Sequence, residues 1–311
     1  MRAVQDLLNE INDRFPVRNS DEQKAAFRAW AAERARKAGH TVREENNEDH
    51  VNLVIGDPDR AEVIFTAHCD TPRRSFQPNL MLPVCAPLRY AYMFANVVPM
   101  LAVSIFGGWL AQRALGEDAS RFVRRIVMLG VYTALYLGLF FLLFRGPANR
   151  HNKNDNTSGT AAVLTLAERL PAGGKAAWIL FDDEEKGKKG SKAFAAAHPE
   201  IKTGTLVVNM DCVGNGTRFL ASVANGARSD PAFAALEKAL AGIDTLVYPA
   251  AKASMNSDQR NFDRGVGLCA CLPSRLAKWY VPRIHTVRDT VASWENIDTL
   301  AAALEGFVRE T

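Results

Sequence analysis

The chain has 311 residues, enough for one α/β domain with an insertion, and its 38 basic and 34 acidic residues leave a net charge of +4. The basic residues are dispersed and no nucleic-acid-binding motif occurs, so we do not expect nucleic acid as a partner. The five cysteines are odd in number and lack C-x-x-C spacing, which argues against a disulfide framework and favours a reducing compartment.

Residues 1–40 predict two helices. The second begins at Ser20, which has capping-box spacing with Gln23. The first is charged and amphipathic without an apolar core, so we expect no signal peptide. Residues 41–55 and 62–67 then predict strands separated by a turn, and the latter strand leads directly into a histidine.

Two long uncharged stretches follow. Residues 90–110 carry no charge, and residues 126–144 have one threonine and two tyrosines as their only polar side chains. At about 1.5 Å per residue, each could cross a hydrocarbon core of about 30 Å. Four arginines lie between the stretches, and Arg89 and Arg145 bracket their outer ends. We predict a transmembrane helical hairpin at residues 89–145 that contacts the lipid bilayer; the alternatives are a buried soluble hairpin or an oligomer interface.

The hairpin divides the predicted catalytic domain in sequence but not in space. An even number of crossings leaves residues 1–88 and 146–311 on the same side of a membrane, where they can fold together. Six basic residues flank the hairpin on that side, against four in its loop, so the positive-inside bias favours a multi-pass protein of the cell membrane with this domain in the cytoplasm. The six are Arg73, Arg74, Arg89, Arg145, Arg150 and Lys153.

Strands and helices alternate after the hairpin, which predicts an α/β fold with a mixed, mostly parallel sheet flanked by helices. The expected order is helix 158–170, strand 176–181, helix 191–197, strand 205–210, helix 230–240, strand 266–272 and helix 294–308.

Four consecutive acids stand at the end of one of these strands. Residues 181–191 read FDDEEKGKKGS, so an apolar strand delivers the acids into a glycine-containing loop. The carboxyl edge of a mostly parallel sheet is where ligands and catalytic groups collect. Adjacent carboxylates repel one another unless positive charge is near, and a divalent metal ion would supply that charge.

Matching metal ligands occur at the ends of other predicted elements: His68 with Asp70, Asp155, Asp211 and His285. Taken alone, most have an ordinary interpretation, such as a structural histidine or an acid at a helix N-terminus. Asp211 differs, because a buried strand that ends in a lone acid needs a charge partner. In the H-x-D pair, the Asp70 carboxylate can take one ring N–H of His68 and leave the other nitrogen free for a metal.

With Asp70 set aside as the partner of His68, the other residues and an acid of residues 181–191 supply two histidines and three carboxylates, enough to hold two zinc ions if one carboxylate bridges them. One adjacent glutamate is left unligated. Two metal ions lower the pKa of a shared water and polarise a carbonyl, while a free carboxylate takes the water's proton and passes it to a leaving amine. The set therefore predicts amide hydrolysis.

The stretches AHCDTP, DNTSGTAAV, FDDEEKGKKGS, NMDCVG and HTVRDT resemble, in order and context, the zinc aminopeptidases of metallopeptidase family twenty-eight, the family of aminopeptidase Y and glutamate carboxypeptidase. The motifs lie within residues 62–72 and 154–291. The resemblance implies a zinc exopeptidase-like fold, two zinc ions and a peptide substrate.

The resemblance also implies a role for each candidate residue. Glu184 is expected to be the general base, and Asp70 is expected to orient the first histidine. The expected metal ligands are His68 and Asp211 for one zinc, Glu185 and His285 for the other, and Asp155 as the bridge between the two.

Two features depart from the family pattern, and a third is expected from it. The connection from Thr71 to Asn154, short in soluble members, here holds the hairpin. Gln259 stands where histidine is common. The family commonly has a cis peptide after the bridging aspartate, which here would join Asp155 to Asn156.

Three functions remain open from the sequence. The leading hypothesis is a membrane-anchored di-zinc aminopeptidase. The second is another amidohydrolase on the same scaffold, such as a dipeptidase, a deacylase or a glutaminyl cyclase with a single zinc. The third is a noncatalytic membrane receptor or scaffold that has kept the fold. Nitrogen and oxygen ligands also admit cobalt or manganese, and the sequence does not determine the natural substrate or the oligomeric state.

Overall fold

The computed structural model describes residues 2–47, 50–76 and 80–310. The body of the molecule is one mixed sheet. Its spatial order is β1 (Val42–Asn47), β2 (His50–Ile55), β4 (Ala176–Phe181), β3 (Val63–His68), β5 (Leu206–Met210), β8 (Gly265–Ser274), β6 (Arg218–Val223) and β7 (Thr245–Pro249), with β9 (Lys278–Tyr280) paired to β8.

The centre of this sheet is parallel and its margins contain antiparallel pairs. Strands β4, β3, β5 and β8 run in one direction. Strands β2 and β6 run against their neighbours β4 and β8. All residues of β3 and β4 are buried, because helices cover both faces, and this explains why these strands read as continuous apolar runs. The predicted fold class is correct.

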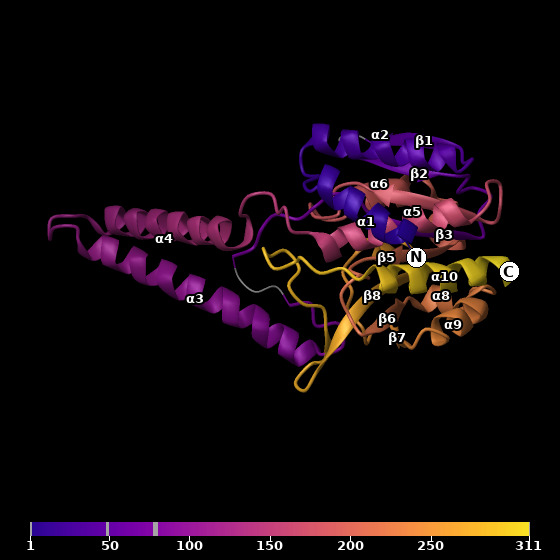
Figure 1. Cartoon of the computed structure of the whole chain (residues 1–311). Coiled ribbons are helices and arrows are strands. Elements are labelled where there is room, and N and C mark those ends of the chain that lie inside the picture. The colour runs from indigo at the N-terminus through magenta and orange to yellow at the C-terminus, as the bar shows by residue number, and fades with distance from the viewer. Residues whose placement is uncertain (1, 48–49, 77–79, 311) are drawn as a thin grey trace.

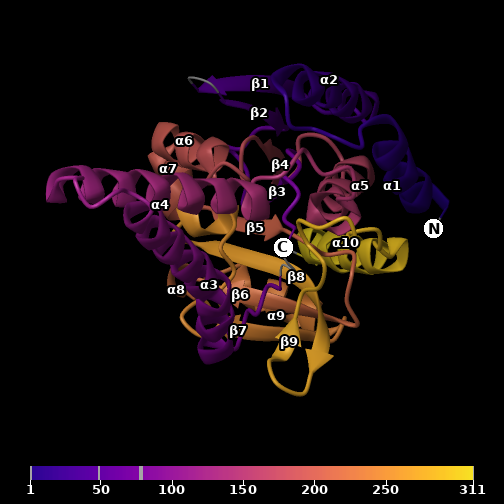
Figure 2. The same ribbon diagram turned by 90° about the vertical axis from the view of Figure 1, so that its left-hand side faces the viewer.

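Helices lie in layers on the two faces of the sheet. Figure 2 shows α1 (Arg2–Arg14), α5 (Gly159–Arg169) and α10 (Trp294–Glu310) on one side, and α6 (Lys189–Ala197) and α7 (Pro199–Gly204) on the other. Neighbouring strand residues serve different cores: Phe65 packs with the first layer and Ile64 with the second. The remaining helices of the body are α2 (Asp21–Lys37), α8 (Asn225–Arg228) and α9 (Phe233–Ala241), with short turns at Lys153–Ser158 and Asp258–Asn261.

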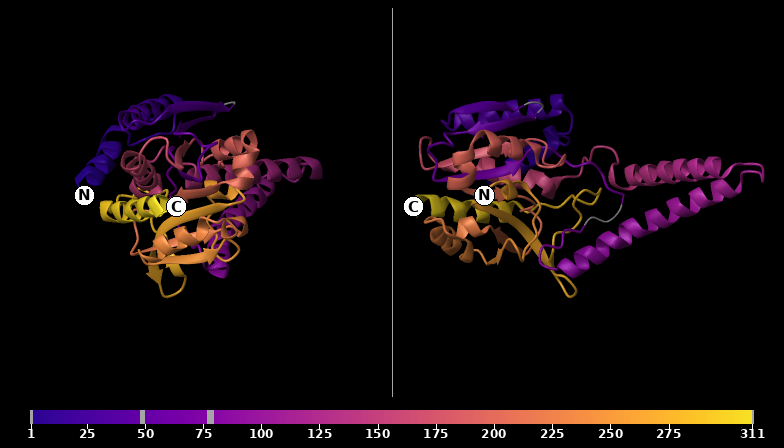
Figure 3. Two further views of the ribbon diagram at one scale, coloured as in Figure 1. Left: turned by 90° about the vertical axis from the view of Figure 1, so that its right-hand side faces the viewer. Right: turned by 180° about the vertical axis from the view of Figure 1, so that it is seen from behind.

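Helices α3 (Ala86–Arg113) and α4 (Arg121–Phe144) leave the body together as a hairpin (Figure 1). Figure 3 shows the tip of this hairpin at the end opposite to α10. In the most apolar 18-residue part of each helix, 17% of the residues of α3 and 0% of those of α4 are buried. Both helices are long and apolar enough to cross a membrane. The hairpin is therefore not buried in the body of this chain, which contradicts the alternative of a buried soluble hairpin.

The parallel strands bring their carboxyl ends to one level. His68, the last residue of β3, pairs in register with Phe181, the last residue of β4. The acids that follow Phe181 therefore emerge beside His68. The loop that carries them closes at Gly190, whose N–H donates to the Asp182 carbonyl oxygen at 3.0 Å, while the Asn52 side chain donates to the Gly190 carbonyl at 3.0 Å.

The tightness of this closure makes a prediction about Gly190. A Cβ atom there would lie 2.4 Å from the Asp182 carbonyl oxygen and 2.7 Å from its nitrogen, and neither backbone atom can move away freely. We expect Gly190→Ala to lower the free energy of unfolding by about 1–3 kcal/mol. The control is Gly204→Ala at the end of α7, where nothing lies within 4 Å. Equal urea midpoints for the two variants would contradict the prediction.

Candidate metal centre

One ring nitrogen of His68 contacts Asp70, and the other faces two further acids, Asp155 and Asp211. Its Nδ1 atom lies 3.2 Å from the Asp70 carbonyl oxygen and 3.4 Å from Asp70 Oδ1. Its Nε2 atom lies 3.4 Å from Asp155 Oδ1 and 3.8 Å from Asp211 Oδ1. The ring is fully buried. Asp70 thus fixes the ring, and the free nitrogen faces two carboxylates at a separation that suits a shared cation.

A second group meets the opposite oxygen of Asp155. His285 Nε2 lies 3.0 Å from Asp155 Oδ2 and 3.3 Å from Glu185 Oε1. Within each of the groups His68–Asp155–Asp211 and Asp155–Glu185–His285, one ligand atom per residue lies within 4.8 Å of the others. The structure therefore brings all five expected ligands together, in two groups that share Asp155.

The donor set fits divalent zinc. Imidazole nitrogens and carboxylate oxygens are common zinc ligands. The buried atoms His68 Nε2 and Glu185 Oε1 form no hydrogen bond with any residue that the structure describes, although buried polar atoms are nearly always satisfied. These two atoms point into the two groups, so a cation in each group would satisfy them.

The electrostatics of the site favour positive charge. Burial opposes ionisation of Asp155, but the facing His285 and His68 outweigh it and hold its pKa well below the usual range. Burial opposes protonation of His285, yet Glu185 and Asp155 raise its pKa well above the ordinary value. Burial, together with neighbouring acids, raises the pKa of Glu184. Any cation placed among these oxygens is stabilised by them.

Glu184 is the candidate general base. Its side chain is partly exposed and lines a cavity of about 440 Å³ together with Asp155, Asp211 and His285. Its carboxylate forms no hydrogen bond or ion pair with the described part of the chain. One of its oxygens lies within 4.8 Å of ligand atoms of His68 and Glu185. The free carboxylate is thus adjacent to both groups.

The four consecutive acids do not act as one unit, which corrects the expectation that a metal relieves them all. Lys24 of α2 is buried, and its Nζ atom lies 2.9 Å from Asp182 Oδ1 and 2.7 Å from Asp183 Oδ1. His50 Nδ1 lies 3.0 Å from Asp183 Oδ2. Asp182 and Asp183 are therefore paired with the Lys24 ammonium group, and the two glutamates are the acids of this stretch that face the metal centre.

Asp70 does more than orient His68. Its two carboxylate oxygens accept hydrogen bonds from the backbone N–H groups of Glu184 and Glu185, each at 3.1 Å. The same carboxylate therefore fixes one histidine and the loop that carries both glutamates. Replacing it would disturb both groups of candidate ligands at once.

Sequence reasoning missed two supporting residues. The Asp289 carboxylate accepts from the backbone N–H of Asn154 at 2.9 Å and of Asp155 at 3.0 Å, and burial raises its pKa to about 8. Arg18 is fully buried and donates to the Cys69 carbonyl at 2.6 Å and to Thr157 Oγ1 at 3.0 Å. Asp289 stands in the quoted HTVRDT stretch and could have been suspected; Arg18 carries no such signal.

The expected cis peptide between Asp155 and Asn156 is present. The Asn156 side chain donates to the Met210 carbonyl at 3.0 Å and accepts from the Cys212 N–H at 3.2 Å. These bonds hold the Asp155 segment against the end of β5, next to Asp211.

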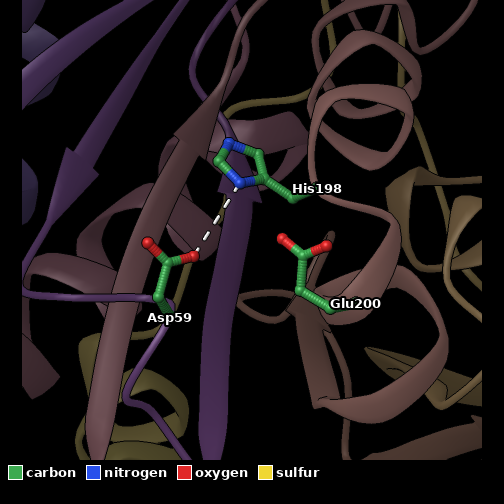
Figure 4. A group of neighbouring side chains, drawn as sticks. All are labelled: Asp59, His198 and Glu200. Carbon is green, nitrogen blue, oxygen red and sulfur yellow. Dashed lines mark ion pairs between the residues drawn. The ribbon is translucent and has the colours of Figure 1, made fainter.

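One further group of possible ligands lies elsewhere, at Asp59, His198 and Glu200 (Figure 4). His198 Nδ1 lies 3.9 Å from Asp59, and its Nε2 already lies 3.0 Å from Glu45 Oε1. Asp59 and Glu200 are exposed. Surface ion pairing accounts for this group.

Histidines and carboxylates at the carboxyl edge of an α/β sheet are typical of metal-dependent hydrolases. The chain belongs to peptidase family M28, because the model of that family matches residues 149–308, half of the chain. The resemblance inferred from the motifs is confirmed at the level of the family, and membership supports a hydrolase. Among curated proteins, no sequence matches this chain.

Solved structures share the fold at low sequence identity. LapA aminopeptidase of Legionella pneumophila has a TM-score of 0.58 and 14% identity, and the match covers 99% of this chain and 68% of LapA. Glutaminyl cyclase of Porphyromonas gingivalis has a TM-score of 0.58, 15% identity and coverage of 99% and 95%. A leucine aminopeptidase precursor of Bacteroides thetaiotaomicron has a TM-score of 0.55, 12% identity and coverage of 99% and 94%. These likenesses establish the fold and not the reaction.

The buried Lys24 makes a prediction about stability. Lys24→Met leaves Asp182 and Asp183 buried without their main cation, and we expect it to lower the free energy of unfolding by about 3–5 kcal/mol. The control is Lys37→Met, because Lys37 pairs with Glu33 on the surface, where a pair contributes about 0–1 kcal/mol. Urea denaturation of both variants measures the difference. A small effect at Lys24 would contradict the prediction and would mean that Lys186 beside Asp183 and Arg28 beside Asp182 suffice to hold the two acids.

Proposed function

We propose that the chain is a membrane-anchored di-zinc aminopeptidase that hydrolyses the first peptide bond of its substrates. One observation carries the proposal: Asp155 presents one oxygen to His68 and the other to His285, so two groups of ligands share a single carboxylate. His68 and Asp211 would hold one zinc, Glu185 and His285 the other, and Asp155 would bridge them.

When bound, the zinc ions would lower the pKa of a water molecule and polarise the substrate carbonyl. The residues of the chain do the rest. The Glu184 carboxylate, which has no hydrogen-bond partner among the described residues, takes the proton of the attacking water and returns it to the leaving amine, so water is added across the amide and a carboxyl and an amine are released. Asp70 holds the ring of His68 and the backbone of Glu184 in place.

Glutaminyl cyclase is the second candidate, because a glutaminyl cyclase matches this fold with the same TM-score as an aminopeptidase. A cyclase would release ammonia from an N-terminal glutamine, with a single zinc expected, whereas an aminopeptidase would release a free amino acid and need two. Mass spectrometry of products and metal content per chain distinguish the two. A noncatalytic scaffold would give neither product.

The general base is tested by Glu184→Gln, which keeps the shape of the side chain and removes its basicity. We expect the metal content to be unchanged and kcat to fall at least about 100-fold. The matched control is Glu200→Gln, a change to an exposed acid of α7, which should leave kcat unchanged. Full activity of Glu184→Gln with normal metal content would remove the residue from its assigned role.

We further propose that α3 and α4 cross the cell membrane and leave the catalytic body on the cytoplasmic side. Lipid would cover the outward faces of both helices at residues 90–110 and 126–144. Support comes from the length of the two helices, the exposure of their apolar side chains, and the position of Arg89 and Arg145 at their outer ends.

Membrane insertion is tested by removing the hairpin. We expect the full chain to stay in the membrane pellet after alkaline carbonate extraction. A variant in which a short Gly-Ser link replaces residues 86–144 should be soluble, because the segments on either side of the link pair with each other in the body. Protease protection in inverted vesicles then reports the side of the body. Release of the full chain by carbonate would contradict the proposal.

A further inference from the structure

The pocket over the candidate metal centre has two chemically different parts. Asp155, Glu184 and His285 line one part of the cavity. The lining also includes apolar and basic side chains, namely Met81, Leu82, Met255, Ile284, Arg89 and Lys188. The cavity therefore joins a hydrolytic centre to an apolar wall that carries positive charge.

Arg89 belongs both to this pocket and to the hairpin. It lies in the first turn of α3, and the uncharged residues 90–110 begin at the next position. One helical turn rises about 5 Å. The lining of the pocket and the beginning of the apolar span are thus separated by no more than one turn. With α3 embedded in lipid, an arginine at this position would lie at the level of the headgroups.

The hairpin joins the body at two ends, here called its roots: Ser75 and Phe76 before α3, and Leu143 at the end of α4. The first root is hydrogen-bonded to the segment that carries His285, and the two roots are hydrogen-bonded to each other. The Ser75 N–H donates to the His285 carbonyl at 2.6 Å, and the Phe76 N–H donates to the Leu143 carbonyl, in the last turn of α4, at 2.9 Å. Met81 pairs with Val281. In Figure 1 the yellow segment before α10 lies between the body and the roots of α3 and α4. The face of the body that contains the pocket is therefore the face from which the hairpin leaves.

The segments around the pocket are basic, whereas the pocket itself holds the acids Asp155, Glu184, Glu185 and Asp211. Three groups of described residues lie near the hairpin roots: residues 71–76 with 80–89, residues 145–154, and residues 275–288. They contain three, three and four basic residues, and no aspartate or glutamate. The turn after β8 extends beyond the carboxyl edge of the sheet, and Leu276 at this turn is 82% exposed. Basic side chains around an exposed apolar residue suit a layer of anionic lipid headgroups.

We propose that the pocket opens at the bilayer surface and that its substrates are polypeptides anchored in the same membrane, whose N-termini emerge at the level of the headgroups. This inference rests on the proposed membrane-anchored aminopeptidase and specifies its substrate class. The hairpin fixes the body with its pocket toward the lipid. An apolar N-terminal segment would enter along the wall of Met81 and Ile284 to reach the metal centre.

The distance between the scissile bond and the bilayer tests the proposal. Full-length protein is reconstituted in liposomes with peptides that share one N-terminal sequence and a C-terminal transmembrane helix. The spacer between them has about four or about twenty Gly-Ser residues, and an extended residue spans about 3.5 Å. Both peptides are concentrated in the membrane equally, so the spacer length is the only difference. A soluble peptide of the same N-terminal sequence completes the set.

We expect the short-spacer peptide to be cleaved within about threefold of the rate of the long one. If the long-spacer peptide is cleaved and the short-spacer peptide is not, the inference is overturned, because the pocket would then face away from the lipid. Chelator-sensitive cleavage of the soluble peptide would still support the proposed function in that case. No cleavage of any peptide would count against the proposed function itself.

A second measurement does not depend on activity. Cys85 is partly exposed, whereas the other four cysteines are buried, so Cys85→Ser removes the native thiol that a label could reach. In this variant, nitroxide labels are attached at Leu276→Cys and, as matched control, at Arg60→Cys. Arg60 is exposed and precedes β3, so it lies at the opposite edge of the sheet. In liposomes of anionic lipid, we expect the Leu276 label to be protected from a water-soluble paramagnetic reagent and the Arg60 label to be accessible. Equal accessibility of the two labels would contradict contact between this face and the bilayer.

Discussion

The structure depends on the neutralisation of several closely spaced carboxylates at one buried edge of its sheet. Like charges that lie a few ångströms apart in a low-dielectric interior are not tolerated without cations. At Asp182 and Asp183 the chain supplies its own cation, the buried amine of Lys24, whose pKa the two acids raise although burial opposes it. At Asp155 and Glu185 the ion-pair partners within the described ranges are imidazole nitrogens of His68 and His285. One half of the edge is thus complete within the protein, and the other half is where we propose that metal ions bind.

Much of this edge could be predicted from the sequence because parallel strands end together. His68, the acids after Phe181, and Asp211 each follow an apolar run, so their meeting needs only the correct fold class. The sequence did not indicate that Asp182 and Asp183 pair with a lysine while the two glutamates face the candidate metal centre. Lys24 is separated from Asp182 by 158 positions and stands in a helix whose sequence does not mark it as buried. Arg18 likewise lies in a connecting segment with no motif. Their roles arise from packing of the N-terminal helices onto the sheet, which local patterns do not encode.

The insertion is tolerated because its two ends meet. Arg73 and Ala148 form an antiparallel bridge, and the Arg74 N–H donates to the Pro147 carbonyl at 2.8 Å while the Gly146 N–H donates back to Arg74 at 3.0 Å. These bonds close the connection below the hairpin. The loop after His68 and the turn that carries Asp155 are therefore joined in the body of the molecule without the hairpin. Sequence reasoning predicted that the two parts can fold together, whereas the pairing that permits it became visible only in the structure.

The same closure couples the hairpin to the site. His285 has a φ of 58°, in the left-handed region that non-glycine residues adopt only when their surroundings enforce it. One of those constraints is the Ser75 N–H, which bonds the His285 carbonyl from the root of the hairpin. A candidate metal ligand is thus held in part by the segment that anchors α3 and α4. If those helices are embedded in lipid, the bilayer fixes the direction in which the pocket opens, and selection of substrates follows from where their N-termini lie as well as from their side chains.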